Sequence, residues 1–183
     1  MTDMDILSQM IKDSALVQLG DNYGKPFVKL IESQAPNSLA IINHLPADSI
    51  VVKADAFRSP NDVFKGEKGE CKRADYVLIS EEKKCIIYIE MKQNKCQWNQ
   101  IVKQLQGAQC FVKYCQEIGK NFWEKNDFLD EYKSRFISIG RTSISKQKTR
   151  ITKNSNCHDT PDRALKIDCP NYIHFNKIAA LKA

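Results

Sequence analysis

Hydrophobic residues recur along the chain with two different spacings, and each spacing predicts a different kind of element. Positions three and four residues apart, typical of an amphipathic helix, recur within residues 3–18 and most regularly within residues 97–118. Pro26 can open a further helix that must end before Pro36, and Gly119 is expected to end the long helix. We expect helices over residues 3–18, 26–34, 97–118 and 121–133.

Short apolar runs bounded by turn residues are typical of buried strands. We expect strands over residues 49–57, on both sides of a turn at 81–84 within residues 73–92, and over residues 135–140, 164–168 and 172–175. The resulting order, α-α-β-β-β-α-α-β-β-β, predicts an α/β protein with a mixed central β-sheet flanked by helices. Residues 1–183 contain no repeat, no low-complexity tract and no linker long enough to divide them, so we expect a single domain.

Both strands of the central hairpin end in charged residues. If residues 81–84 form the turn, Asp75 faces Glu90, and Lys92 projects from the same face as Glu90 because side chains alternate along a strand. Two carboxylates placed opposite each other repel, and burial increases the repulsion. Lys92 supplies one compensating charge, whereas a divalent cation such as Mg²⁺, which takes carboxylate oxygens, supplies two. The pattern therefore predicts a metal site at this end of the hairpin.

The alternative is that these charges are solvated strand ends. The pattern Glu-x-Lys is common in this chain, where it also begins at residues 70, 81, 82 and 131. The copy formed by Glu90 and Lys92 differs from the others because it ends an apolar run and has an acid across from it. Its context, and not the pattern itself, favours the metal site.

The segment R-A-D ending at Asp75, followed by the strand I-Y-I-E-M-K that ends at Lys92, resembles the signature of the PD-(D/E)XK nuclease superfamily. Ala74 stands where that signature has proline. The resemblance covers about residues 26–140 and implies the restriction-endonuclease-like αβββαβ core, with residues 26–34 as its first helix. An N-terminal helix and a basic, β-rich C-terminal extension would flank this core.

The resemblance also implies a mechanism. Asp75 and Glu90 would hold one or two Mg²⁺ ions, or Mn²⁺, with the main-chain carbonyl of Met91 as a further ligand. Lys92 would position the attacking water or stabilise charge on the phosphorus. The product would carry a 5′-phosphate.

Three auxiliary residues have alternatives that the sequence leaves open. Glu32, on the expected helix before the sheet, is either an additional metal-linked acid or an exposed helix acid. Glu70 is either an auxiliary acid or a solvated acid of a glycine-rich turn. Gln104 either resembles the glutamine on the helix of RecB-like members or is a polar residue at the flank of the apolar stripe; the Q-x-x-x-Y spacing is absent, because Ala108 follows four residues later.

The net charge of +6 permits a nucleic-acid partner without requiring one. Residues 141–153 are basic and contain no acid. We expect phosphate contacts from Arg141, Lys146, Lys148, Arg150 and Lys153. In an extended strand the residues at 146, 148 and 150 would share one face; the alternative is a solvated basic loop.

The seven cysteines are odd in number and form no CxxC pair, which indicates reduced thiols in a cytoplasmic protein. A zinc site from Cys157, His158 and Cys169 matches no strong spacing pattern. No apolar run approaches the ~18 residues of a membrane span. No P-loop, GxGxxG or GxSxG motif appears, so kinase, dinucleotide-binding and Ser–His hydrolase functions have no support.

These features favour a small metal-dependent endonuclease of restriction, defence or repair type, with DNA favoured over RNA as its partner. A homodimer would let such an enzyme cut both strands, although no interface can be named from the sequence. One alternative is a non-catalytic nucleic-acid-binding or assembly module on the same fold. Another is an unrelated α/β interaction domain whose hairpin acids are solvated.

Overall fold

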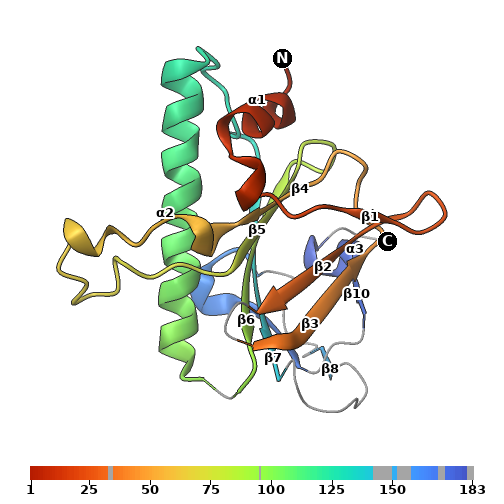
Figure 1. Cartoon of the computed structure of the whole chain (residues 1–183), viewed down its shortest axis with the longest axis vertical. Helices are drawn as coiled ribbons and strands as arrows, with labels where there is room; N and C mark the ends of the chain where they lie inside the picture. Colours follow the sequence, from red (N-terminus) through yellow and green to blue (C-terminus); the bar gives the residue numbers. More distant parts are fainter. Residues whose placement is uncertain (33–34, 95, 142–149, 152–157, 169–171, 181–183) are drawn as a thin grey trace.

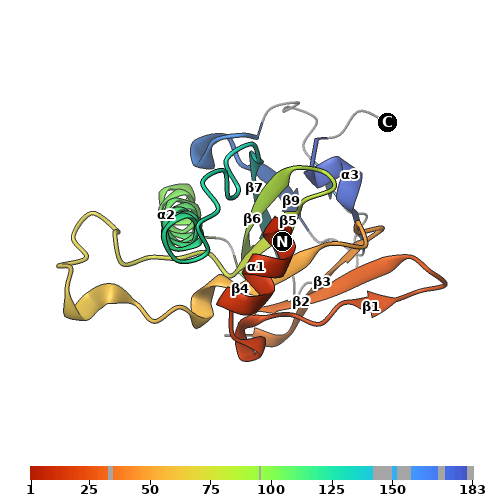
Figure 2. The ribbon, with the colours of Figure 1, turned by 90° about the horizontal axis from the view of Figure 1, so that it is seen from above.

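The computed structural model describes residues 1–32, 35–94, 96–141, 150–151, 158–168 and 172–180. Its elements form three layers, which the perpendicular views of Figures 1 and 2 show. The larger β-sheet lies in the middle. Helices α1 (Asp3–Met10) and α2 (Trp98–Phe122) pack on one face of this sheet, whereas a smaller sheet and helix α3 (Phe175–Ile178) pack on the other.

Within the described residues the larger sheet has the strand order β4-β5-β6-β7-β9-β8. These strands are β4 (Ile50–Lys53), β5 (Tyr76–Ser80), β6 (Cys85–Lys92), β7 (Lys133–Gly140), β9 (Leu165–Asp168) and β8 (Arg150–Ile151). β4, β5 and β6 pair antiparallel, β6, β7 and β9 pair parallel, and β8 is antiparallel to β9. α2 makes the crossover that the parallel pair β6–β7 requires. The prediction of an α/β protein with a mixed sheet is therefore confirmed, but a second sheet, which the sequence did not predict, covers one face of the larger sheet together with α3.

The smaller sheet has the order β1-β2-β3-β10 in the described part of the chain. Its strands are β1 (Gly20–Asp21), β2 (Pro26–Glu32), β3 (Ala35–Asn43) and β10 (Ile173–His174). Alternation along β6 divides the core in two: Ile87 and Ile89 face the smaller sheet, while Ile86 and Tyr88 face the two long helices. Because both faces are covered, β5 and most of β6 are buried at every position.

The helix predicted over residues 26–34 is wrong, because residues 26–32 form strand β2; residues 33–34 lie outside the described residues. Val28 and Leu30 are fully buried, whereas Lys29 and Ile31, which alternate with them, are exposed; this is the pattern of a strand with one covered face. Phe27 through Ile31 pair antiparallel with β3, so a long-range sheet contact overrides the local helix signal of Pro26.

Two further helix predictions need correction. The first helix ends at Met10, well before residue 18, because Leu16 and Val17 bridge to β4; the Val17 N–H donates to the Val51 carbonyl at 2.8 Å. α2 runs past Gly119 to Phe122, and turns replace the helix expected over residues 121–133. Gly119 lies inside α2, where a Cβ atom would stand 2.2 Å from the Phe128 ring.

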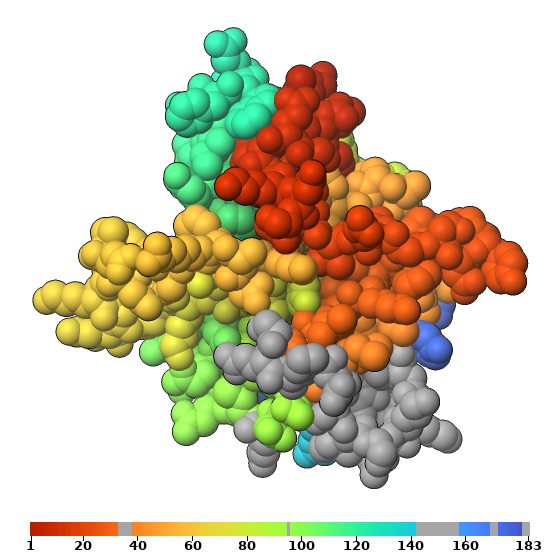
Figure 3. All heavy atoms as spheres, in the orientation of Figure 1, coloured from red at the N-terminus to blue at the C-terminus, as the bar shows by residue number. Residues whose placement is uncertain are grey.

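The other predicted strands are present with adjusted ends. The turn at 81–84 is confirmed by the pairing of Ser80 with Cys85. The strand expected over residues 49–57 is limited to β4, and the last strand ends at His174, where α3 begins. The turn-rich segment between β4 and β5 and the β1–β2 turn project on opposite sides of the molecule (Figure 3). None of the described helices is both long enough and apolar enough to cross a membrane.

Candidate active site

The predicted acids and lysine meet at the open end of the β5–β6 hairpin, on the face covered by α2. Asp75 directly precedes β5. Because Tyr76 pairs with Ile89, the next residue of β6, Glu90, lies beside Asp75. Ile89 and Met91 pack into the core toward the smaller sheet, which leaves Glu90 and Lys92 on the α2 face.

Direct contacts join these residues. Lys92 Nζ lies 2.6 Å from Glu90 Oε1, and the Met91 N–H donates to Asp75 Oδ2 at 2.6 Å. Glu90 is fully buried, and neither of its carboxylate oxygens meets a hydrogen-bond donor with good geometry among the described residues. The strands thus hold two acids and one cation in a fixed cluster, in which the buried Glu90 carboxylate has Lys92 as its charged contact.

Burial dominates the electrostatics of the cluster. It raises the pKa of Asp75 to about 6, although the Met91 N–H and the charge of Lys92 both act to lower it. Burial, followed by the charge of Asp75, raises the pKa of Glu90 to about 8 against the opposing effect of Lys92. For Lys92 burial acts to lower the pKa, but the charges of Glu90 and Asp75 outweigh it and the pKa is raised. One lysine is therefore not enough to keep both acids readily ionised.

Two more acids lie near this cluster. Glu32 is buried at the end of β2, its Oε2 has no partner among the described residues, and its charge raises the pKa of both Asp75 and Glu90. Its strand is held to β5 by the Tyr76 hydroxyl, which accepts a hydrogen bond from the Ile31 N–H at 3.1 Å. The sequence suggested Glu32 for the site but placed it on a helix.

Asp55 was missed by the sequence analysis. It is an exposed acid of the short 3₁₀ turn Ala54–Ala56, and its charge raises the pKa of Asp75. The Ala54 N–H donates to the Asp75 carbonyl at 2.9 Å, which ties this turn to the site. The available signal was the position of Asp55 just after a strand, in the sequence K-A-D.

The residues at the site fit a hard divalent cation. In the described part of the chain no three His, Cys, Asp or Glu side chains are grouped as a preformed metal site. The donor set is instead two carboxylates, from Asp75 and Glu90, with the Met91 carbonyl and the unpaired Glu32 oxygen nearby. Oxygen donors of this kind suit Mg²⁺, which keeps several waters and takes only one or two carboxylates from the protein.

The two other auxiliary residues are not joined to the cluster by contacts among the described residues. Glu70 accepts hydrogen bonds from the N–H groups of Gly66 and Lys68, both at 2.9 Å, and so stabilises its own turn. Gln104 is half-buried on α2, one turn after Gln100, whose side-chain oxygen accepts a hydrogen bond from Lys72.

Of the five basic residues predicted to contact phosphate, Arg141 and Arg150 are described. Arg141 is exposed just after β7, with a left-handed φ of 55°. Arg150 begins β8, where its backbone pairs with Asp168. Lys146, Lys148 and Lys153 lie outside the described residues, so the prediction of a shared basic face is untested.

The proposed zinc ligands are only partly described. Cys157 and Cys169 lie outside the described residues. His158 is buried, and its Nε2 lies 2.6 Å from the Ile178 carbonyl. This contact gives the imidazole a structural role between the larger sheet and α3.

A cavity of about 380 Å³ opens beside the cluster. Lys92 and Arg141 line it together with three residues the sequence analysis did not select for the site, Trp98, Lys166 and Asp168. Trp98 was counted only as part of the apolar stripe of the long helix. These residues come from α2 and β9, so only the tertiary fold brings them to the end of β6.

The arrangement combines a buried pair of oxygen donors, a lysine in contact with one of them and an adjacent cationic cavity. Such a set can bind a metal ion and a phosphate group side by side. Comparisons with models of protein families, with curated proteins and with solved structures found no match to this chain.

Proposed function

We propose that this protein is a metal-dependent nuclease of the PD-(D/E)XK type that hydrolyses phosphodiester bonds, with DNA as its favoured substrate. The observation that carries the proposal is the meeting of Asp75, Glu90 and Lys92 at one end of a buried hairpin. A buried pair of acids with raised pKa values is unfavourable for the fold alone, which points to a functional reason for keeping it.

The topology supports the same proposal. α1, β4, β5, β6, α2 and β7 follow one another in the order αβββαβ, with three antiparallel strands and a fourth that is parallel to the third. α1 takes the place that we expected for residues 26–34. Strands β1, β2 and β3 of the smaller sheet would then be an insertion between the first helix and the first core strand, and this insertion brings Glu32 to the site.

Asp75, Glu90 and the Met91 carbonyl would hold Mg²⁺ or Mn²⁺. When bound, this cation would polarise the scissile phosphate and lower the pKa of a bound water. The Met91 N–H orients Asp75 by its 2.6 Å hydrogen bond. N–H and C=O of one residue point to the same neighbouring strand, so the Met91 carbonyl also lies on the Asp75 side of β6.

Lys92 has two roles in this proposal. Its ammonium, 2.6 Å from Glu90, favours the ionised form of that acid and can donate hydrogen bonds that position an attacking water or stabilise charge on a phosphate oxygen. Its side chain is 24% exposed, so it can reach a substrate from the edge of the buried cluster. The net charge of +6 and Arg141 beside the cavity would favour approach of a polyanion.

The second candidate is a non-catalytic nucleic-acid-binding module on the same fold. It is favoured by one observation, the short ion pair between Lys92 and Glu90, because such a pair can balance a buried acid without a metal. The two candidates differ in one respect: only the nuclease needs a metal at Asp75 and Glu90.

A cleavage assay separates them. Single- and double-stranded DNA and RNA are incubated with the wild type in Mg²⁺, Mn²⁺ or EDTA, together with Lys92→Ala and the matched control Lys177→Ala, which removes an exposed lysine of α3. We expect metal-dependent cleavage that falls by roughly 10²–10³-fold in Lys92→Ala and is unchanged in the control. Folded wild-type protein that binds nucleic acid but cleaves nothing in either metal would favour the binding module.

A further inference from the structure

The floor of the cavity beside the acids, here called the side pocket, is made by residues of two rows that cross the sheet; the buried Glu90 ends the first row and is not part of the lining. Register places Glu90 beside Ser138 and Ser138 beside Lys166, all on the α2 face. In the next row Lys92 lies beside Gly140, which lies beside Asp168. Adjacent strands are about 4.8 Å apart, so Lys166 stands about 10 Å across the sheet from Glu90.

The side pocket is cationic. Lys92, Arg141 and Lys166 line it, and Asp168 is the acid among its lining residues. Gly140 keeps the floor open, since a Cβ atom there would stand 2.8 Å from Asp168 Oδ1. Three cations against one acid at a concave surface favour an anionic ligand, and phosphate is the anion that the neighbouring acids would process.

The side pocket also has an aromatic wall. Trp98, at the start of α2, is half-buried, and Lys166 Nζ lies 3.8 Å from the centroid of its ring. Both residues line the pocket, so the face of Trp98 that Lys166 covers is on the pocket side. Lys166 is exposed, so its ammonium can move from the ring to a phosphate when a flat group replaces it there.

The volume of the side pocket limits the size of the ligand. The volume of about 380 Å³ is at the lower end of the ~300–1,000 Å³ range of small-molecule sites, which suits one nucleotide and is too small for a base pair. A base within a duplex is stacked on its neighbours and cannot lie against Trp98 without leaving the stack.

We infer that the side pocket binds one unpaired nucleotide of the strand that is cut, with its phosphate between Lys166 and Arg141 and its base against Trp98. This inference rests on the proposed nuclease function and names its substrate class. The enzyme would act where a strand is single or frayed next to the scissile bond, and not within an intact duplex.

Binding without metal tests the inference separately from cleavage. Trp98 and Trp123 are the two tryptophans of the chain, so Trp123→Phe leaves Trp98 as the single fluorescent probe. This variant is titrated in EDTA with a 5′-phosphorylated oligothymidylate, with thymidine 5′-monophosphate and with inorganic phosphate. We expect both nucleotides to quench Trp98 and to bind at least tenfold more tightly than inorganic phosphate, because stacking contributes only for a base.

Lys166→Met in the same background should lower the affinity for both nucleotides by about tenfold, as the loss of one charge-assisted contact does. Lys177→Met should leave both affinities unchanged. Asp75→Asn should keep the binding and lose the cleavage, which separates the two proposals. Equal affinity for inorganic phosphate would reduce the site to an anion site and overturn the inference. The inference would also be overturned if the mononucleotide bound but the oligonucleotide did not, or if neither quenched Trp98.

Discussion

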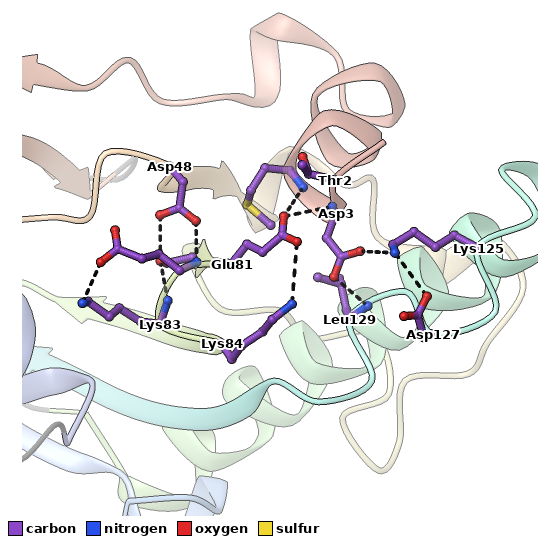
Figure 4. Close-up of polar contacts among 12 residues, drawn as sticks. Thr2, Asp3, Asp48, Glu81, Lys83, Lys84, Lys125, Asp127 and Leu129 are labelled. Carbon is purple, nitrogen blue, oxygen red and sulfur yellow. Dashed lines mark hydrogen bonds and ion pairs between the residues drawn. The ribbon is translucent and has the colours of Figure 1, made fainter.

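The two ends of the β5–β6 hairpin carry similar charged residues in opposite situations. At the turn end the acids are matched by donors, as Figure 4 shows. Asp48 accepts hydrogen bonds from the Ser80 hydroxyl at 2.9 Å and from the Glu82 N–H at 2.7 Å. Glu81 accepts from the N–H of Asp3 at 3.0 Å, at the N-terminus of α1, where the helix dipole also favours a negative charge.

Asp3 continues this matched network. It is almost fully buried, but its Oδ2 accepts a hydrogen bond from the Leu129 N–H at 3.3 Å and its Oδ1 lies 3.5 Å from Lys125 Nζ (Figure 4). Asp48, Glu81 and Asp3 thus each tie two segments of chain together. Acids used in this way stabilise the fold, because the hydrogen bonds they accept offset the cost of removing them from water.

At the open end the acids are brought close to one another and receive few donors. Glu90 has Lys92 as its charged contact, and its pKa rises to about 8 because burial and the charge of Asp75 both oppose ionisation. The comparison shows that acids at the turn end receive backbone N–H and hydroxyl donors, whereas neither Glu90 oxygen receives such a donor among the described residues. The incomplete compensation at Asp75 and Glu90 is therefore the feature that indicates a ligand.

The strongest way to disturb the open end is through its backbone. α2 approaches the segment before Asp75 so closely at Gly107 that a Cβ atom there would stand 1.6 Å from the Lys72 carbonyl oxygen. We expect Gly107→Val to lower the free energy of unfolding by about 3 kcal/mol or more, since the backbone of Lys72 cannot move aside. Urea unfolding measures the loss, and Gln106→Ala on the exposed side of α2 is the control, with a change within ~0.5 kcal/mol. A Gly107→Val protein as stable as the control would mean that α2 does not position this segment.

The next effect is a pH dependence of stability that arises at the open end. Raised pKa values mean that Asp75 and Glu90 add stability below their ordinary pKa values and lose it as the pH rises through about 6 and about 8. In EDTA we expect the wild type to lose stability between pH 5 and pH 9. Glu90→Gln should be more stable than the wild type at pH 9 by a few kcal/mol, because each pKa unit corresponds to about 1.4 kcal/mol. Thermal unfolding at both pH values measures this; a Glu90→Gln protein less stable at pH 9 would show that the ion pair with Lys92 is the dominant effect.

The smallest of these effects is expected at the turn end. Asp48→Asn replaces an acceptor by an amide donor that cannot serve both Ser80 and Glu82, so we expect a loss of about 1–2 kcal/mol at neutral pH. Cleavage and metal binding should be unchanged. Urea unfolding measures the stability and a cleavage assay measures the activity. An Asp48→Asn protein that is as stable as the wild type but inactive would mean that the turn end, and not the open end, serves the function.

The sequence predicted the parts of the molecule that depend on local pattern. The run C-I-I-Y-I and the charged turn before it are sufficient for the hairpin and for the positions of Asp75, Glu90 and Lys92. The segment after Pro26 could not be settled in this way, because its apolar residues fit both a helix and a strand. Pairing with β3, which is a long-range contact, decides between them.

The rest of the candidate site depends on the tertiary fold. Glu32, Asp55, Trp98 and Lys166 come from four separate elements, and no spacing along the chain relates them. Lys166 in particular looks like an ordinary exposed residue of a short strand until β9 is placed two strands from β6. Sequence patterns can therefore identify the acids that share a hairpin, but not the pocket beside them.

Calorimetric titration of the protein with Mn²⁺ at pH 8 tests the central claim most directly, namely that the open end of the hairpin is a cation site. The wild type, Glu90→Gln and Asp48→Asn are compared in buffers of different ionisation enthalpy. We predict binding to the wild type with release of protons, because Glu90 with a pKa of about 8 must lose its proton to act as a ligand. Binding should be lost in Glu90→Gln and retained in Asp48→Asn. A folded wild type that binds no Mn²⁺, or binding that survives in Glu90→Gln, would contradict the account.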